Sequence, residues 1–181
     1  MIWAESKLGR WSRFTLALPV FGEEGLYRFH LHRALDRARR SHETVSLIGV
    51  RLEGGLAARE EDGPSAMEEA FRLALATAEK MLFKSRDTLL PLPDQAEMRV
   101  LLPGTAKKDA LVVLRRLSAG LEKAFEGREG LRPELAYGVS SYPEDGVSAP
   151  ELENHLAEAT GPFRVSGEGD LPADLDPFSL L

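Results

Sequence analysis

The chain has 181 residues, of which 43% are apolar and 29% charged, and this composition is typical of a soluble globular domain. Its net charge of −6 argues against nucleic acid as the main partner, and the absence of cysteine excludes disulfides and thiolate metal sites. No apolar run approaches the ~20 residues of a membrane-spanning helix, and no signal-peptide pattern is present at the N-terminus. We therefore expect a cytoplasmic protein without membrane insertion.

The first half of the chain predicts an arm followed by alternating helices and strands. Residues 1–24 are expected to form an N-terminal arm, in which the alternation at residues 14–18 before Pro19 indicates an extra edge strand. Apolar spacing predicts a helix over residues 25–41, and the β-branched run 44–52 predicts a central strand buried on both faces. Ser65 and Glu68 have the spacing of a capping box, which predicts a helix from there to about residue 83.

The second half begins with a hairpin. Residues 89–103 are two apolar runs around a polar turn, which predicts two antiparallel strands. A helix opening at residue 104, a strand over 131–143 and a short helix capped by Ser148 and Glu151 follow, and residues 163–165 predict a last short strand. Helices interleaved with a hairpin predict an α/β (α+β) sandwich, with a mixed sheet of about five strands covered by helices.

Residues 167–181 form an acidic tail that contains two prolines, and this composition predicts disorder. The tail ends with Pro-Phe-Ser-Leu-Leu, which is apolar enough to be a docking peptide, although a terminus without a binding function is the commoner case. The folded domain is therefore expected within residues 25–166.

Four stretches in this domain resemble one family, in the order and near the spacing that the family has. They are residues 37–48, 100–105, 151–159 and, most specifically, Tyr-Gly-Val-Ser-Ser-Tyr-Pro-Glu-Asp-Gly at 137–146. This last segment is similar to the Gly-Val-Ala-x-Tyr-Pro-x-Asp-Gly segment of GGDEF domains, the diguanylate cyclase family. The resemblance implies the nucleotide-cyclase fold. It also implies a chemistry that joins two GTP molecules into cyclic di-GMP, using carboxylates for two metal ions and a glycine pair beside the nucleotide.

The residues that this chemistry needs are replaced. The metal-binding carboxylate of the signature falls on Ala96, and the strand-end aspartate falls on Arg51, whose fixed positive charge repels Mg²⁺. The resemblance thus implies a degenerate domain that is not an enzyme and binds no metal or cofactor. The five signature positions fall on Asp94, Gln95, Ala96, Glu97 and Met98.

The family's product-inhibition site, Arg-x-x-Asp, falls on residues 84–87. Asp87 is kept and Arg86 precedes it, but Lys84 stands where the first arginine is expected, and lysine lacks the planar fork that favours guanine and phosphate. The residues at this site are compatible with residual binding of cyclic di-GMP. None of the four histidines has a spacing that predicts a metal site.

We therefore expect an inactive GGDEF-like domain that acts as a regulatory or protein-interaction module in bacterial signalling, with a link to cyclic di-GMP. The expected partner is another protein or a second copy of the chain. The alternative is a receptor that binds cyclic di-GMP or GTP without turning it over. A resemblance at the level of the fold alone is a further alternative, since similar sheets carry unrelated functions.

Overall fold

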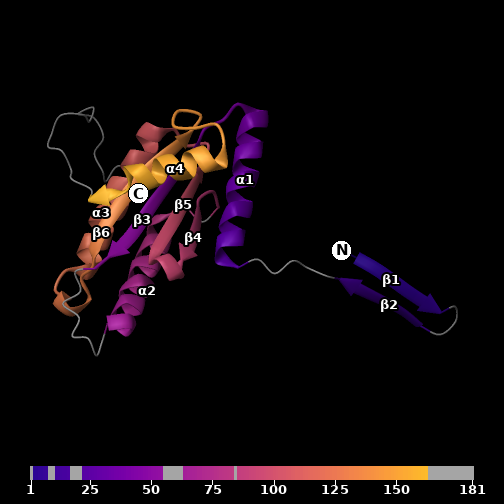
Figure 1. Cartoon of the computed structure of the whole chain (residues 1–181), viewed down its shortest axis with the longest axis horizontal. Coiled ribbons are helices and arrows are strands. Elements are labelled where there is room, and N and C mark those ends of the chain that lie inside the picture. Colours follow the sequence, from indigo (N-terminus) through magenta and orange to yellow (C-terminus); the bar gives the residue numbers. More distant parts are fainter. Residues whose placement is uncertain (1, 8–10, 17–21, 55–62, 84, 163–181) are drawn as a thin grey trace.

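The computed structural model describes residues 2–7, 11–16, 22–54, 63–83 and 85–162 (Figure 1). Seven strands are assigned: β1 (Ile2–Lys7), β2 (Trp11–Leu16), β3 (Val45–Glu53), β4 (Thr88–Leu92), β5 (Glu97–Pro103), β6 (Glu134–Tyr142) and β7 (Gly161–Pro162). The α-helices are α1 (Glu23–Ser41), α2 (Gly63–Met81), α3 (Lys107–Phe125) and α4 (Ala149–Ala159), with short 3-10 helices at Pro93–Gln95 and Glu129–Leu131. The predicted domain of alternating helices and strands is confirmed.

The main sheet has the strand order β4-β5-β3-β6-β7. It consists of four longer strands and, next to β6, the two-residue β7. Every described pairing in it is antiparallel, so the expectation of a mixed sheet is wrong. The physical reason lies in the crossovers. Helices α2 and α3 each connect two strands that run in the same direction, but an antiparallel strand lies between the members of each pair.

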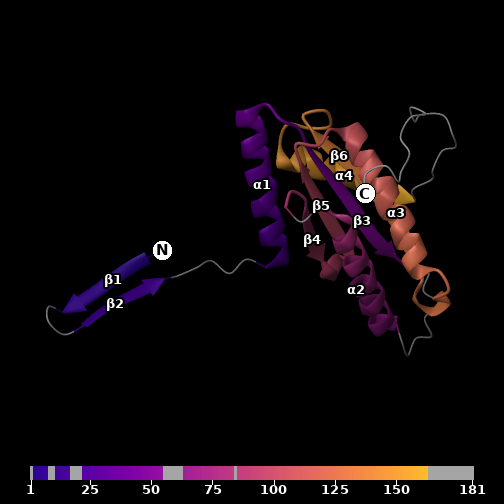
Figure 2. The same ribbon diagram turned by 180° about the vertical axis from the view of Figure 1, so that it is seen from behind.

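Two helices cover each face of this sheet, and the views from the two sides show the layers (Figures 1 and 2). Alternate residues of β3 face opposite sides: Ile48 and Val50 join the core under α2 and α3, whereas Val45 and Leu47 join the core under α1 and α4. Both sets are almost completely buried. The prediction of a central strand buried on both faces is therefore confirmed.

The two predicted capping boxes have different outcomes. Ser148 is the N-cap of α4, where its Oγ accepts a hydrogen bond from the Glu151 N–H at 3.4 Å. The Glu151 carboxylate in turn accepts from the Val147 N–H at 2.8 Å, so both orphan donors are satisfied. Helix α2, in contrast, begins at Gly63, two residues before the expected cap Ser65, because the Gly-Pro pair already supplies the first helical positions.

The N-terminal segment forms its own sheet. Strands β1 and β2 pair antiparallel, with Ile2 opposite Leu16, and neither belongs to the main sheet. The extra strand expected at residues 14–18 is therefore a hairpin strand instead of an edge strand of the domain. The last strand expected at 163–165 and the tail 167–181 lie outside the described residues. Within the described part of the chain, no helix is long and apolar enough to cross a membrane.

Candidate functional site

The tip of the β4–β5 hairpin holds the residues that align with the GGDEF signature. A 3-10 turn at Pro93–Gln95 joins the strands, and all three of its residues are exposed. Ala96 then adopts the left-handed conformation, with φ 47° and ψ 36°, which lets the chain enter β5. The Ala96 carbonyl accepts a hydrogen bond from the Leu52 N–H at 2.9 Å, so the tip is tied to the end of β3. Met98 is fully buried in the core under α2 and α3.

Two shallow hollows flank this tip. One, of about 210 Å³, lies against the start of α1, and the other, of about 310 Å³, lies against the first turns of α2. Glu23, Glu24 and Asp94 line the first hollow, and none of the described residues that line it is a lysine or arginine. A nucleotide triphosphate is repelled by such a lining unless cations neutralise it. The second hollow is lined by Met67, Glu68, Phe71, Arg72, Pro93 and Ala96.

Arg51 occupies the end of β3 beside the tip. In the register of the sheet it lies opposite Glu97 on β5 and Ala136 on β6. Its guanidinium donates from Nε and Nη2 to the Glu53 Oε1 at 3.0 and 2.6 Å, two residues along the same face of the strand. Both side chains are about two fifths exposed. The cation predicted from the sequence is thus present at the strand end and is neutralised by its own neighbour.

Glu97 is the remaining acidic residue of the signature, and it is buried. Its Oε1 lies 2.7 Å from Arg99 Nε, and its Oε2 accepts from Arg99 Nη2 at 3.1 Å. The Arg99 guanidinium also lies 5.6 Å from the centroid of the Tyr27 ring of α1, and burial raises the pKa of that phenol. A Cβ at Gly49 would lie 3.1 Å from Glu97 Oε1, so the glycine makes room for the carboxylate.

These residues do not fit a divalent metal ion. Oxygen ligands with free lone pairs are what Mg²⁺ requires, and both Glu97 oxygens are already engaged by one guanidinium while a second guanidinium lies opposite. Across the described residues, no group of three or more His, Asp or Glu side chains could hold a metal ion.

The inhibitory-like site is a closed turn at the end of α2. Asp87 has a fully buried side chain, whose Oδ2 accepts from the Phe83 N–H at 3.0 Å and whose Oδ1 accepts from Arg86 Nε at 3.0 Å. The Asp87 N–H returns a bond to the Phe83 carbonyl at 2.8 Å. Asp87 therefore stabilises the chain reversal between α2 and β4. The structure brings Arg86 and Asp87 together, while Lys84 lies outside the described residues.

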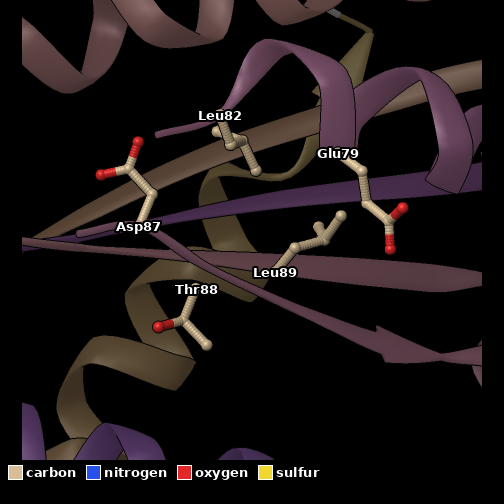
Figure 3. A pocket seen from close by; sticks show the side chains of 5 residues that line it. All are labelled: Glu79, Leu82, Asp87, Thr88 and Leu89. Carbon is tan, nitrogen blue, oxygen red and sulfur yellow. The ribbon is translucent and has the colours of Figure 1, made fainter. Parts of the chain in front are cut away.

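A hollow of about 400 Å³ lies next to this turn, and Figure 3 shows its lining. The side chains of Leu82 and Leu89 lie between the carboxylates of Glu79 and Asp87, which point away to opposite ends (Figure 3). Thr88 completes the lining. Two carboxylates and two leucines make a poor cradle for a phosphate.

Sequence reasoning missed a cluster around Asp145, which entered only as part of the Tyr-Pro-Glu-Asp-Gly segment. Its Oδ1 lies 2.6 Å from Lys107 Nζ at the start of α3 and 3.2 Å from His155 Nε2 on α4. Its Oδ2 accepts from the Ser141 N–H at 2.9 Å. The hydrogen bond from Lys107 to Asp145 raises the pKa of the lysine. The Asp-Gly turn was the available signal, but the partners of Asp145 are 38 residues before and ten residues after it.

No protein-family model matches the chain. Among curated proteins it is 26% identical over 156 residues to the type II cuticular keratin Hb2 of Homo sapiens. That match covers 83% of the chain but 30% of the keratin, so the chain spans less than a third of that relative's length. The identity is too low to show a family.

Solved structures give a consistent result for the fold. A DGC protein from Thermotoga maritima is 16% identical with a TM-score of 0.60, over 79% of this chain and 97% of that protein. The GGDEF domain of FimX from Pseudomonas aeruginosa is 18% identical with a TM-score of 0.60, over 74% and 83%. The diguanylate cyclase SiaD of the same species, solved in complex with its activator SiaC, is 18% identical with a TM-score of 0.61, over 74% of this chain and 51% of SiaD. This chain therefore has the fold of GGDEF domains over about three quarters of its length.

Proposed function

We propose that the chain is a catalytically inactive GGDEF-like domain that serves as a regulatory, protein-binding module in bacterial signalling. The observation that carries this proposal is the pairing of charges at the end of β3. Arg51 is held by Glu53, and Glu97 opposite it is held by Arg99. Metal-assisted phosphoryl transfer needs carboxylate oxygens free to hold the ions that polarise the phosphates. Arg51 and Arg99 put two guanidiniums next to Glu97, and their positive charge would repel such ions.

The hairpin tip supports a role in binding another protein. A glycine pair would let a phosphate approach the backbone, whereas Asp94 and Gln95 place exposed side chains at this position. The acidic hollow beside α1 is unfavourable to a triphosphate for the electrostatic reason given above. The complex of SiaD with SiaC is an instance in which a protein with this fold binds an activator protein, which favours a protein as the partner here.

Incubation of the chain with GTP and Mg²⁺ or Mn²⁺, followed by chromatography, tests the catalytic half of the proposal. We expect neither pyrophosphate nor cyclic di-GMP, while an active diguanylate cyclase in the same buffer gives both. Product from the wild type that is lost in Glu97→Gln would refute inactivity, because it would show that the remaining signature carboxylate takes part in turnover.

Light scattering and affinity capture from the native organism test the partner half. We expect self-association or one reproducible partner, lost in the variant Asp94→Lys with Gln95→Lys, which changes exposed side chains only. Arg33→Glu, an exposed change on α1, serves as the matched control and should leave the interaction in place. A strictly monomeric protein that captures nothing would contradict the module.

The alternative is a receptor that binds cyclic di-GMP or GTP without turnover, and the retained Asp87, with Arg86 beside it, favours it. Calorimetry with both ligands separates the two functions. Heat at high micromolar ligand that is lost in Arg86→Ala and kept in Arg33→Ala would establish the receptor. Absence of heat for the wild type removes it, and the structure favours that result because both Asp87 oxygens already accept hydrogen bonds within the turn.

A further inference from the structure

A surface at the junction of α2 and α3 combines exposed apolar side chains with arginines. Phe83 is 59% exposed and Val112 is 49% exposed. The guanidiniums of Arg86 and Arg116 lie 5.5 and 5.8 Å from the centroid of the Phe83 ring. The residues of this surface, called the Phe83 patch below, are Phe83, Arg86, Leu111, Val112, Arg115 and Arg116.

The patch is built on fixed backbone. Arg116 Nη2 donates to the Met81 carbonyl at 2.7 Å, so the middle of α3 is anchored to the last residue of α2. Val112 lies one helical turn before Arg116, and Leu111 lies one turn before Arg115, so these four side chains share the outer side of α3. Apolar area and positive charge are thus interleaved over one continuous surface.

Two of the three arginines of this patch lack a partner of opposite sign among the described residues. Arg115 and Arg116 form no ion pair with a described carboxylate, whereas Arg86 pairs with Asp87 and keeps its side chain about half exposed. A ligand that fits must therefore carry both negative charge and apolar side chains.

Residues 167–181 of the chain have this composition. They contain four carboxylates and no lysine or arginine, and they end in Phe178, Leu180 and Leu181. The segment from residue 163 onward can extend to about 60 Å, whereas a domain of this size is about 40 Å across, so the distance sets no obstacle. Residue 162 ends β7, which pairs with Ala136 and Tyr137 near the start of β6.

We infer that the acidic segment 167–181 docks on the Phe83 patch of its own chain, with its carboxylates on the arginines and its terminal apolar side chains on Phe83 and Val112. Docking of this kind covers the patch until a partner of the same acidic and apolar chemistry displaces the segment. The inference rests on the surface and the tail alone and is independent of whether the domain turns over a nucleotide.

A second exposed phenylalanine with an arginine lies on α1, on the other face of the sheet, and serves as an internal comparison. Arg33 lies 5.5 Å from the ring centroid of Phe29, which is 41% exposed. The first turn of α1 carries Glu23 and Glu24, which repel an acidic segment. The tail should therefore discriminate between the two phenylalanines.

Paramagnetic relaxation in the full chain tests the inference, and the absence of cysteine makes labelling simple. A nitroxide at Ser179→Cys should broaden the amide signals of residues 83, 86, 112 and 116, while those of 29 and 33 keep their intensity. Raising the salt from about 0.1 M to about 1 M shortens the Debye length from about 10 Å to about 3 Å and should remove much of this broadening.

Charge exchange provides the second test. The double change Asp174→Lys with Asp176→Lys should abolish the broadening, and so should Arg116→Glu. The three changes combined should restore it. Arg33→Glu should have no effect. The inference would be overturned if no signal were broadened, or if the broadened signals were those of α1. It would also be overturned if the broadening arose only between molecules, as measured in a mixture of nitroxide-labelled protein and isotope-labelled protein without the nitroxide.

Discussion

Arg51 and Glu97 lie directly opposite each other on β3 and β5, yet each forms its ion pair within its own strand, two residues further along. The Arg51–Glu53 pair is about two fifths exposed, whereas the side chains of Arg99 and Glu97 are 13% and 6% exposed. Two Arg–Glu pairs with the same spacing along a strand therefore differ in burial. Their contributions to stability should differ accordingly.

Glu97→Gln should lower the free energy of unfolding by about 3 kcal/mol, because it leaves the Arg99 guanidinium buried without a carboxylate. Arg51→Gln, the matched change in the exposed pair, should cost less than about 1 kcal/mol because solvent screens that pair. Urea denaturation followed by circular dichroism measures both. Equal effects of the two substitutions would contradict the difference in burial.

Ala96→Gly should stabilise the protein by about 0.5–1 kcal/mol, because Ala96 has φ 47° and a Cβ is unfavourable in the left-handed region. Ala119→Gly in the exposed part of α3 is the control and should destabilise by about 1 kcal/mol. Midpoints of urea denaturation give both values. Destabilisation by both glycines would mean that residue 96 does not adopt this conformation in solution.

Gly138→Ala should destabilise by about 1–3 kcal/mol, because a methyl group there forces overpacking. Its Cβ would lie 2.5 Å from Thr160 Oγ1 and 2.9 Å from the Leu156 carbonyl oxygen, so α4 would have to shift away from β6. Gly54→Ala, where no atom lies within 4 Å, should change stability by less than about 0.5 kcal/mol. Thermal unfolding of the three proteins decides the matter, and a neutral Gly138→Ala would show that α4 packs less closely than described.

Glu151 makes the stability of α4 depend on pH. Its pKa lies below the ordinary value of 4.5, mainly because the carboxylate accepts the Val147 N–H, with Ser148 and Arg39 adding to the effect. A carboxyl group with a lowered pKa in the folded state stabilises the protein above its unfolded pKa, and this stabilisation is lost as the pH falls through the folded value. Denaturation midpoints between about pH 6 and pH 3 should thus fall less steeply in Glu151→Gln than in the wild type. Parallel profiles would contradict this role.

The elements that the sequence predicted well were those with a strong local pattern. The apolar run of β3, the two apolar runs of the hairpin and the spacing of Ser148 with Glu151 depend on neighbouring residues, so the local pattern was sufficient to predict them. The ion pairs within β3 and β5 also had a local signal, since residues two apart share one face of a strand. That Arg51 faces Glu97 follows from the register of two strands separated by a helix and a third strand, and no local pattern fixes it.

Contacts between distant segments account for the rest. Lys107, Asp145 and His155 come from three elements that meet only when the sheet has formed. Asp87 was predicted to contact a ligand, but its buried carboxylate stabilises a turn instead. Its neighbours along the chain donate the N–H groups that this carboxylate needs. The sequence analysis predicted a mixed sheet instead of an antiparallel one. The reason is that a helix between two strands does not show whether a third strand lies between them in the sheet.

One border of the main sheet limits how copies of this domain can associate. That border is β4, whose Pro91 has no N–H to offer. This border is therefore a poor template for adding a strand from another molecule. Assembly through β-augmentation is disfavoured at β4, and a partner on this side has to be recognised through side chains, such as those of the hairpin tip.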